Sequence, residues 1–344
     1  MSIRLRVVNG DADLEAWRQV RIAVLPNERC TTVEWMRASM TPERLYLLAE
    51  FDGVLAGSGL GGRSDLGCAG LHPRVLPWAR RRGVGTALLL ALAEHAVQHG
   101  FEEAGTNVDD PGSIAFAERF GYREVDRQVE QVRVIGDEPA ASVPPGIEIV
   151  SLEDRPELWA AAYDPLALET FADMATDRPI VVSREQWERD WLASPEAMFL
   201  ALADGEIVGC AGLERDTDNP GRAEHAVTAV RRDWRRRGLA TALKRATLAF
   251  AGDHGIGEVY TWTQRGNDDM RRLNERLGYV TRSESVTVRA SLPLPWRNRT
   301  APRSSFSQAR ESLRKLHTSA PPAPCPRGTG SIGSEMHRAR GTGG

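Results

Sequence analysis

The sequence predicts an α/β protein made of two copies of one domain followed by a basic tail. Three observations lead to this prediction. Strand-like and helix-like segments follow in the same order in each half of the 344-residue chain. Each half has an Asp-Gly turn between two apolar runs, which is a strong signal for a β-hairpin. Each half also has a loop rich in arginine and glycine between a strand and a long apolar helix.

The first copy begins with an alternating strand at 3–8 and an amphipathic helix whose apolar residues recur every three to four positions. The elements expected after that helix are a helix near 32–40, a hairpin of strands 45–51 and 54–60, a strand ending at Val75, a helix at 86–98, a strand at 103–108, a helix at 113–120 and a strand at 122–135. The second copy repeats this order. Its expected elements are a strand at 147–150, helices at 156–168 and 184–192, a hairpin of strands 198–203 and 207–213, a strand at 224–230, a helix at 241–253, a strand at 258–263, a helix at 268–277 and a strand at 279–288.

Near-constant spacings support the repeat. The aspartates of the two Asp-Gly turns, 52 and 204, lie 152 residues apart. The first glycines of the two loops, 83 and 238, lie 155 apart, and the closing Gly-Tyr pairs begin at 121 and 278, which is 157 apart. We therefore predict domains at 1–135 and 147–290, joined by a linker rich in Pro, Ala and Gly at 136–146.

The predicted tail, 291–344, differs from the body in charge. It has nine basic and two acidic residues, a net of +7, so the formal −3 of the whole chain leaves −10 for the body. Its proline, serine and glycine content without an apolar period predicts disorder. The tail is either a solvated extension or an arm that binds a partner, a polyanion such as nucleic acid, or a membrane.

Composition excludes several classes of function for the body. An acidic body is a poor match for a phosphate backbone, so we expect no nucleic-acid ligand there. Four scattered cysteines and seven unclustered histidines predict neither a disulfide framework nor a metal site. Apolar runs are too short for a membrane span, and no signal-peptide core is present. We expect a cytoplasmic protein with no membrane association, and its oligomeric state stays open.

The two loops have the character of an anion cradle. In the first copy the residues are Val75, which ends the strand, then Arg80, Arg81, Arg82, Gly83, Val84, Gly85 and Thr86. In the second they are Val230, then Arg235, Arg236, Arg237, Gly238, Leu239, Ala240 and Thr241. Small residues let backbone N–H groups approach a phosphate, and the following helix directs its positive end there. The Gly-Lys-Ser/Thr ending of a P-loop is missing.

These loops, together with segments 107–122 and 267–279, resemble the GNAT superfamily of acyl-CoA-dependent N-acetyltransferases in its tandem form. The resemblance covers 1–290. It implies a twisted mixed sheet flanked by helices in each copy, with two central strands that splay apart to admit acetyl-CoA as co-substrate. It also implies that acetyl-CoA lies against the residues of one of these loops, Val75 with 80–86 or Val230 with 235–241, with Asn267 and Asn274 beside it in the second copy. Whether the first copy binds acetyl-CoA stays open.

The resemblance also assigns a catalytic base. Acyl transfer requires a deprotonated amine, and many family members use a Glu 14 residues before the first loop glycine. That position is Glu224 in the second copy and Ala69 in the first, so we expect chemistry in the second copy. His225 is expected to face the other side of the strand. The family's proton donor, a Tyr four residues before the closing glycine, is replaced by Ala117 and Asn274, which leaves the general acid open.

The expected acceptor is the primary amine of a small molecule. Three carboxylates between two strands of the second copy, Glu214, Asp216 and Asp218, favour a cationic acceptor. An ordinary polar loop is the alternative for them. A non-catalytic acyl-CoA-binding sensor or scaffold is the alternative for the whole protein, because Ala69, Ala117 and Asn274 depart from the catalytic pattern.

Overall fold

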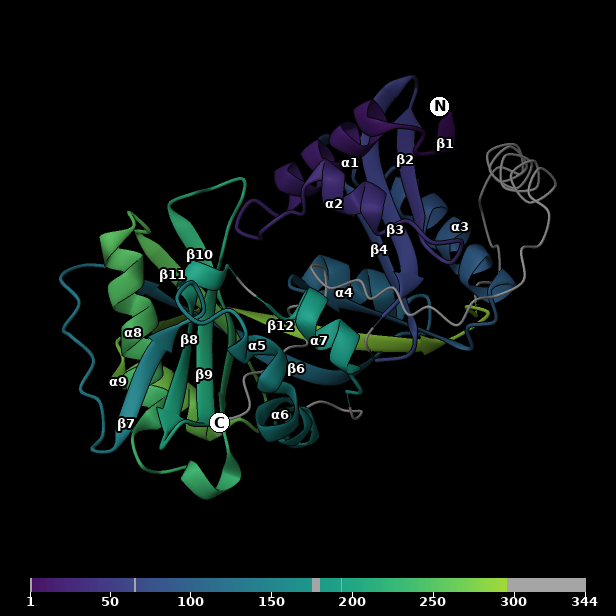
Figure 1. Cartoon of the computed structure of the whole chain (residues 1–344). Coiled ribbons are helices and arrows are strands. Elements are labelled where there is room, and N and C mark those ends of the chain that lie inside the picture. Colours follow the sequence, from purple (N-terminus) through teal and green to yellow (C-terminus); the bar gives the residue numbers. More distant parts are fainter. Residues whose placement is uncertain (1, 65, 175–179, 193, 296–344) are drawn as a thin grey trace. The chain divides into compact units, whose positions relative to one another are not determined.

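The computed structural model describes residues 2–64, 66–174, 180–192 and 194–295. Within that part of the chain it forms two compact units, one of residues 2–124 with 288–295 and one of Val125–Thr287. Each unit is a mixed sheet with helices on both faces (Figure 1), as the sequence predicted. Most of the predicted tail lies outside the described residues. Its first residue, Ser291, ends a strand, and the Leu292 N–H donates to the Glu102 carbonyl at 2.7 Å.

The first unit has its strands in the order β1-β2-β3-β4-β5, with the end of β12 beside β5. Its elements are β1 (Ile3–Val7), α1 (Asp11–Val24), α2 (Val33–Ala38), β2 (Leu45–Phe51), β3 (Val54–Arg63), β4 (Ala69–Val75), α3 (Val84–Gln98), β5 (Glu103–Val108) and α4 (Pro111–Glu118). The pairs from β1 to β4 are antiparallel, and β4 pairs with β5 in parallel.

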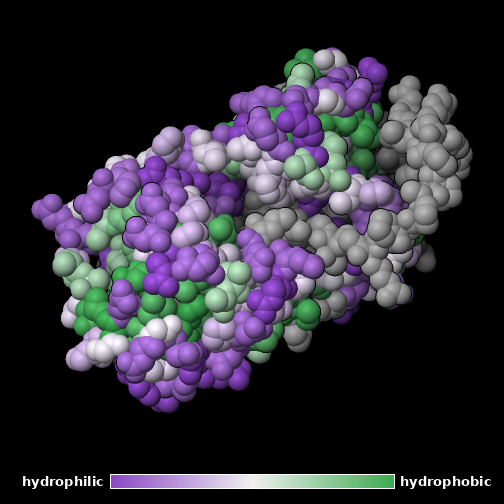
Figure 2. Space-filling model, in the orientation of Figure 1, coloured by the Kyte–Doolittle hydropathy of each residue, from purple (hydrophilic) through white to green (hydrophobic). Residues whose placement is uncertain are grey.

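Helices α1 and α3 cover opposite faces of this sheet. Leu60 of β3 packs with Leu14 and Trp17 of α1. A Cβ on the preceding residue, Gly59, would lie 3.2 Å from Leu88 of α3, so the glycines of β3 let α3 approach closely. Figure 2 shows hydrophilic surface over the outer side of α1, which is the expected pattern for an amphipathic helix.

The second unit has the strand order β12-β6-β11-β10-β9-β8-β7. Its elements are β6 (Arg123–Val134), β7 (Ile147–Ser151), α5 (Leu158–Ala161), α6 (Leu168–Asp173), α7 (Arg184–Asp190), β8 (Met198–Ala203), β9 (Glu206–Arg215), β10 (Arg222–Val230), α8 (Leu239–Asp253), β11 (Glu258–Gln264), α9 (Asp268–Arg276) and β12 (Val280–Ser291). Helices α8 and α9 lie on one side of the sheet, with α5 and α6 on the other (Figure 1). The predicted helix 156–168 is broken by a π-helical turn, Tyr163–Ala167, which contains Pro165.

The two repeats exchange their last strands. Strand β6 ends the first repeat in sequence, yet it pairs antiparallel with β11 of the second unit from Val134 opposite Glu258 to Gln128 opposite Gln264. The end of β12, the last strand of the second repeat, lies beside β5 of the first unit. Each unit is therefore completed by a strand from the other repeat, so the compact units and the sequence repeats have different boundaries.

The central parallel strands of each unit separate after a short pairing. β10 and β11 pair only from Arg222 opposite Glu258 to Glu224 opposite Tyr260, although β10 continues to Val230 and β11 to Gln264. In the first unit, β4 and β5 pair at only two positions. The splay implied by the family resemblance is thus present in both units.

Candidate functional site

Each arginine- and glycine-rich loop ends in a helix whose first backbone N–H groups have no side-chain cap. Gly238 precedes α8 with φ 84°, and Gly83 precedes α3 with φ 89°. Two residues earlier, Arg236 and Arg81 also have positive φ, at 61° and 62°. Because the first N–H groups of a helix have no partner within the helix, each loop presents a set of donors to an anion.

The arginines of the loops have two different roles. The Nε of Arg235 donates to the carbonyl of Val230 at 3.0 Å, and Arg80 makes the matching bond to Val75 at 3.3 Å. These bonds close each loop onto the end of its strand. The later arginines are exposed: Arg81 and Arg82 in the first unit, Arg236 and Arg237 in the second. They are the side chains whose charge is presented to solvent beside the helix start.

Asp173, the last residue of α6, holds the second loop from the side. Its carboxylate accepts from Arg235 Nη2 at 2.6 Å and from Arg232 Nε at 2.9 Å. These hydrogen bonds lower the pKa of Asp173. Among the described residues, no carboxylate makes a corresponding hydrogen bond to Arg80 in the first loop.

The gap between the splayed strands differs between the units. In the first unit His72 Nδ1 of β4 lies 3.1 Å from Thr106 Oγ1 of β5, so a hydrogen bond bridges the gap. In the second unit the corresponding threonine, Thr261, is fully buried and has no hydrogen-bond partner among the described residues. Val227, at the position of His72, cannot bridge to it. In the second unit, therefore, no hydrogen bond from Thr261 joins the two strands across the gap.

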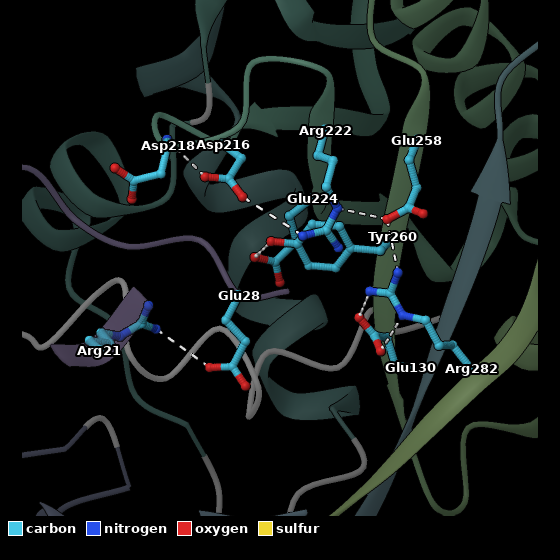
Figure 3. A network of polar contacts seen from close by, with 10 residues as sticks. All are labelled: Arg21, Glu28, Glu130, Asp216, Asp218, Arg222, Glu224, Glu258, Tyr260 and Arg282. Carbon is cyan, nitrogen blue, oxygen red and sulfur yellow. Dashed lines mark hydrogen bonds and ion pairs between the residues drawn. The ribbon is translucent and has the colours of Figure 1, made fainter. Parts of the chain in front are cut away.

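Glu224 lies where β10 and β11 stop pairing. Only 6% of its surface is exposed, and the Tyr260 hydroxyl donates to its Oε2 at 3.4 Å. Figure 3 shows the carboxylate and this hydroxyl facing each other, with Arg222 beside the Tyr260 ring. The Arg222 guanidinium is 4.6 Å from the centre of that ring, so its charge is placed over the aromatic face. Glu224 is thus a buried carboxylate at the entrance to the gap.

An ion-pair network continues from Arg222 along the same side of the sheet (Figure 3). Arg222 Nε donates to Glu258 Oε1 at 2.7 Å, and Arg282 Nη1 donates to the same oxygen at 2.9 Å. Arg282 also binds Glu130 through two hydrogen bonds. Burial alone would raise the pKa of Glu258, but the two arginines outweigh it and the pKa is lowered. The network fixes Arg222 and so supports Tyr260.

His225 points to the other side of β10, as the strand alternation predicted. Its Nε2 is 3.0 Å from Thr247 Oγ1 of α8, and its Nδ1 is 2.9 Å from the Tyr279 hydroxyl. Since Thr247 donates its own proton to the Lys244 carbonyl, it accepts from Nε2–H, and the Tyr279 hydroxyl donates to Nδ1. Burial, with the charge of Lys244, lowers the pKa of His225 well below its usual value. His225 is a neutral core residue.

The sheet register shows which residue of the first unit corresponds to Glu224. A β-bulge interrupts the β9–β10 pairing between His225 and Val227, and β3–β4 has no such interruption. Glu224 lies opposite Glu214, and the equivalent pair in the first unit is Gly70 opposite Gly62. Counting back from the loop gives Ala69 because it ignores the bulge. The first unit has no carboxylate at either position.

The three carboxylates expected to attract the acceptor have different environments. Glu214 is half-buried opposite Glu224. Asp216 is buried: its Oδ1 accepts from the Asp218 N–H at 3.0 Å and its Oδ2 lies 3.9 Å from Arg222. Asp216 therefore holds the turn between β9 and β10, while Asp218 is exposed on that turn.

Two asparagines of the second unit were expected beside the cofactor. Asn267 is the N-cap of α9, where its side chain accepts from the Met270 N–H at 3.3 Å. Asn274 is fully buried, and its Nδ2 donates to Gln131 Oε1 of β6 at 2.9 Å. The Oδ1 of Asn274 has no hydrogen-bond partner among the described residues. Asn274 thus presents a buried acceptor, whereas Asn267 serves mainly to start a helix.

Comparisons with known proteins show the family of the chain. The model of the Acetyltransferase (GNAT) family matches residues 14–122 and 159–279, once in each repeat and over more than half of the chain. The protein belongs to this family and is an N-acetyltransferase of the tandem type.

Several relatives are named mycothiol acetyltransferase. The chain is 29% identical to that of Thermomonospora curvata over 72% of this chain and 82% of the relative. It is 28% identical to that of Catenulispora acidiphila over 62% of this chain and 69% of the relative. Among solved structures it resembles a GCN5-related N-acetyltransferase from Sphaerobacter thermophilus, with TM-score 0.64 and 21% identity over 84% of this chain and 95% of that one. A tandem GNAT protein from the clavulanic acid biosynthesis pathway gives the same score and identity, over 84% of this chain and 98% of that one.

Among the described residues, no helix is both long and apolar enough to span a membrane. In the same part of the chain, no three side chains of His, Cys, Asp or Glu gather in a way that could bind a metal ion.

Proposed function

We propose that the protein transfers an acetyl group from acetyl-CoA to the primary amine of a small molecule, and that the second unit performs the reaction. The observation that carries the proposal is the position of Glu224: a buried carboxylate at the point where the two strands part, in the one unit whose gap is unbridged at Thr261.

The residues of the second unit suit acetyl-CoA as co-substrate. The uncapped start of α8, with Arg236 and Arg237 exposed beside it, suits the pyrophosphate. Buried polar atoms without partners, Thr261 Oγ1 and Asn274 Oδ1, suit a polar chain lying in the gap, since such atoms are normally satisfied by a ligand or water. Thioester chemistry supplies an activated acetyl group there.

Glu224 acts as the general base in this proposal. It accepts the proton that the attacking amine loses, directly or through one water, while the Tyr260 hydroxyl fixes one of its oxygens. A backbone N–H near Val230 polarises the thioester carbonyl, because a donor at that position stabilises the developing oxyanion.

The acceptor is proposed to be cationic. Glu214 and Asp218 lie at the β9–β10 end of the site, and the folded body has an excess of acidic residues. The relatives named for mycothiol agree with a small-molecule acceptor.

A free-thiol assay with acetyl-CoA against amines, amino acids and aminoglycosides tests the proposal. We expect turnover with at least one cationic amine and about 100-fold less turnover in Glu224→Gln. Binding of acetyl-CoA without turnover of any amine would instead favour the sensor or scaffold.

A further inference from the structure

Lys244 of α8 is buried in the core of the second unit without a hydrogen-bond partner for its amino group. Its side chain is 0% exposed, and Nζ has no acceptor among the described residues. Nζ lies 5.4 Å from the centre of the Tyr279 ring. Burial lowers the pKa of Lys244 to about 7. An unpaired ammonium in a core is costly, so its presence calls for a function.

The first unit provides an internal comparison. Lys244 lies six residues after the loop glycine Gly238, and the residue six after Gly83 is Leu89. Leu89 is buried in the apolar core of the first unit. Likewise Asn274 corresponds to Ala117, and Thr228 of β10 corresponds to Pro73. In the second unit Thr228 Oγ1 and Asn274 Oδ1 are, like Lys244 Nζ, buried without a partner among the described residues. Partnerless polar atoms thus replace apolar groups in the unit that carries Glu224.

The contacts of α8 with β10 place Lys244 at the level of Thr228. Leu243 of α8 packs with Val230 at the end of β10, and Thr247 contacts His225 near its bulge. Lys244 lies between these two along α8, and therefore beside the part of β10 that contains Thr228. This is the stretch in which β10 no longer pairs with β11. Lys244 accordingly faces the sheet where the strands have parted, on the side of β10 opposite to Glu224.

The groups around Lys244 do not neutralise it. From β10 it meets His225, which is neutral, and from the segment before β12 it meets Tyr279, whose pKa is raised by burial. Beyond Tyr279, Arg133 and Glu138 form their own ion pair at 2.7 Å. The buried polar residues Thr261 of β11 and Asn274 of α9 in the same unit do not titrate. Hence no described residue supplies an acceptor for the Lys244 ammonium.

We propose that Lys244 is the proton donor to the departing thiolate of CoA, the role that the family's tyrosine leaves open where Asn274 stands. The inference rests on the proposed function. As the amine nitrogen bonds to the thioester carbon, the C–S bond breaks and its electron pair remains on sulfur. Lys244 passes one ammonium proton from Nζ to that sulfur, which gives the free thiol and a neutral lysine. Glu224 holds the proton lost by the amine, and solvent restores the proton on Lys244.

The thiol pKa of bound CoA, followed by thiolate absorbance, tests this proposal without turnover. An ammonium within contact distance lowers that pKa by about one unit or more. We expect the lowering in the wild-type protein and in Lys244→Arg, which keeps the charge, and its loss in Lys244→Met, which fills a similar volume. Leu89→Met, at the matching position of the first unit, is the control and keeps the wild-type value.

Kinetics provide the second readout. Lys244→Met and Lys244→Arg both lose about 100-fold in kcat, the lower end for a positioned proton donor, because thiolate is already a good leaving group. In the wild type, deprotonation of Lys244 makes kcat/KM fall as pH rises. This fall disappears in Lys244→Met. An unchanged bound-thiol pKa together with wild-type kcat in Lys244→Met would overturn the proposal. Absence of turnover in the wild type would count against the proposed function, and the bound-thiol pKa would still decide the role of Lys244.

Discussion

The Tyr260 hydroxyl donates a hydrogen bond of 3.4 Å to Glu224 Oε2 at the last residue pair that joins β10 to β11. The carboxylate is held on the α5–α6 side of the sheet, because its neighbour His225 points to α8. The proposed base and the gap proposed to hold the cofactor therefore meet at one residue pair, so the contribution of each side chain can be tested separately.

Glu224→Gln is expected to reduce kcat about 100-fold while leaving acetyl-CoA affinity unchanged, because the amide keeps the size but does not accept the proton. Steady-state kinetics and calorimetric binding measure the two effects. Glu206→Gln, an exposed change at the start of β9, is the control. Full activity in Glu224→Gln would exclude this residue as the base.

Tyr260→Phe removes one hydrogen bond and leaves the ring under Arg222. The loss of a single bond worth about 1 kcal/mol predicts roughly a fivefold fall in kcat. Comparing Tyr260→Phe in the wild-type and Glu224→Gln backgrounds measures the coupling. Equal effects of Tyr260→Phe in both backgrounds would show that Tyr260 does not act through Glu224.

Gly238→Glu is expected to abolish acetyl-CoA binding and turnover. A side chain at φ 84° strains the loop, and its carboxylate would repel the pyrophosphate that we propose binds at this helix end. Gly83→Glu imposes the same strain in the first unit, at φ 89°, and serves as the matched control. We expect it to spare turnover because His72 and Thr106 bridge the gap there. The reverse outcome, loss in Gly83→Glu alone, would assign the chemistry to the first unit.

The sequence predicted the repeat and the loop-to-helix starts from local patterns, and the splayed mixed sheets through its resemblance to the GNAT superfamily. It could not locate the residue equivalent to Glu224 in the first unit, since a bulge at Ala226 shifts the register without any clear sequence signal. It did not single out Lys244 by itself, because a lysine within a helix normally lies in solvent. The one signal for Lys244 was that the equivalent residue of the first copy, Leu89, is apolar. The sequence also did not predict that β6 and β12 lie beside strands of the other repeat. The alternating pattern of a strand is the same whichever repeat supplies its neighbour.

The burial of Lys244 predicts a pH dependence of stability. Its pKa is about 7 when folded and 10.5 as an unperturbed group, so between these values the unfolded chain binds more protons. Because of Lys244, the free energy of unfolding therefore increases as pH rises from about 7 toward 10. Below about pH 7 the lysine is charged in the folded protein, and the full cost of burying that charge is present. Chemical denaturation of wild type and Lys244→Met across this range isolates the effect. The difference between the two should shrink as pH rises, and a constant difference would show that Lys244 does not titrate in this window.

The strand exchange predicts that the second repeat does not fold alone. Fragment 147–290 lacks β6, and with it Gln131, which accepts from Asn274, and Glu130, which binds Arg282. It would leave buried polar groups unpaired and expose the edge of β11. Fragment 123–291, which begins with β6, retains these contacts and corresponds closely to the second compact unit. We expect a cooperative thermal transition for 123–291 and none for 147–290, measured by circular dichroism. Equal stability of the two fragments would mean that β6 is dispensable and that the sequence repeat is itself the folding unit.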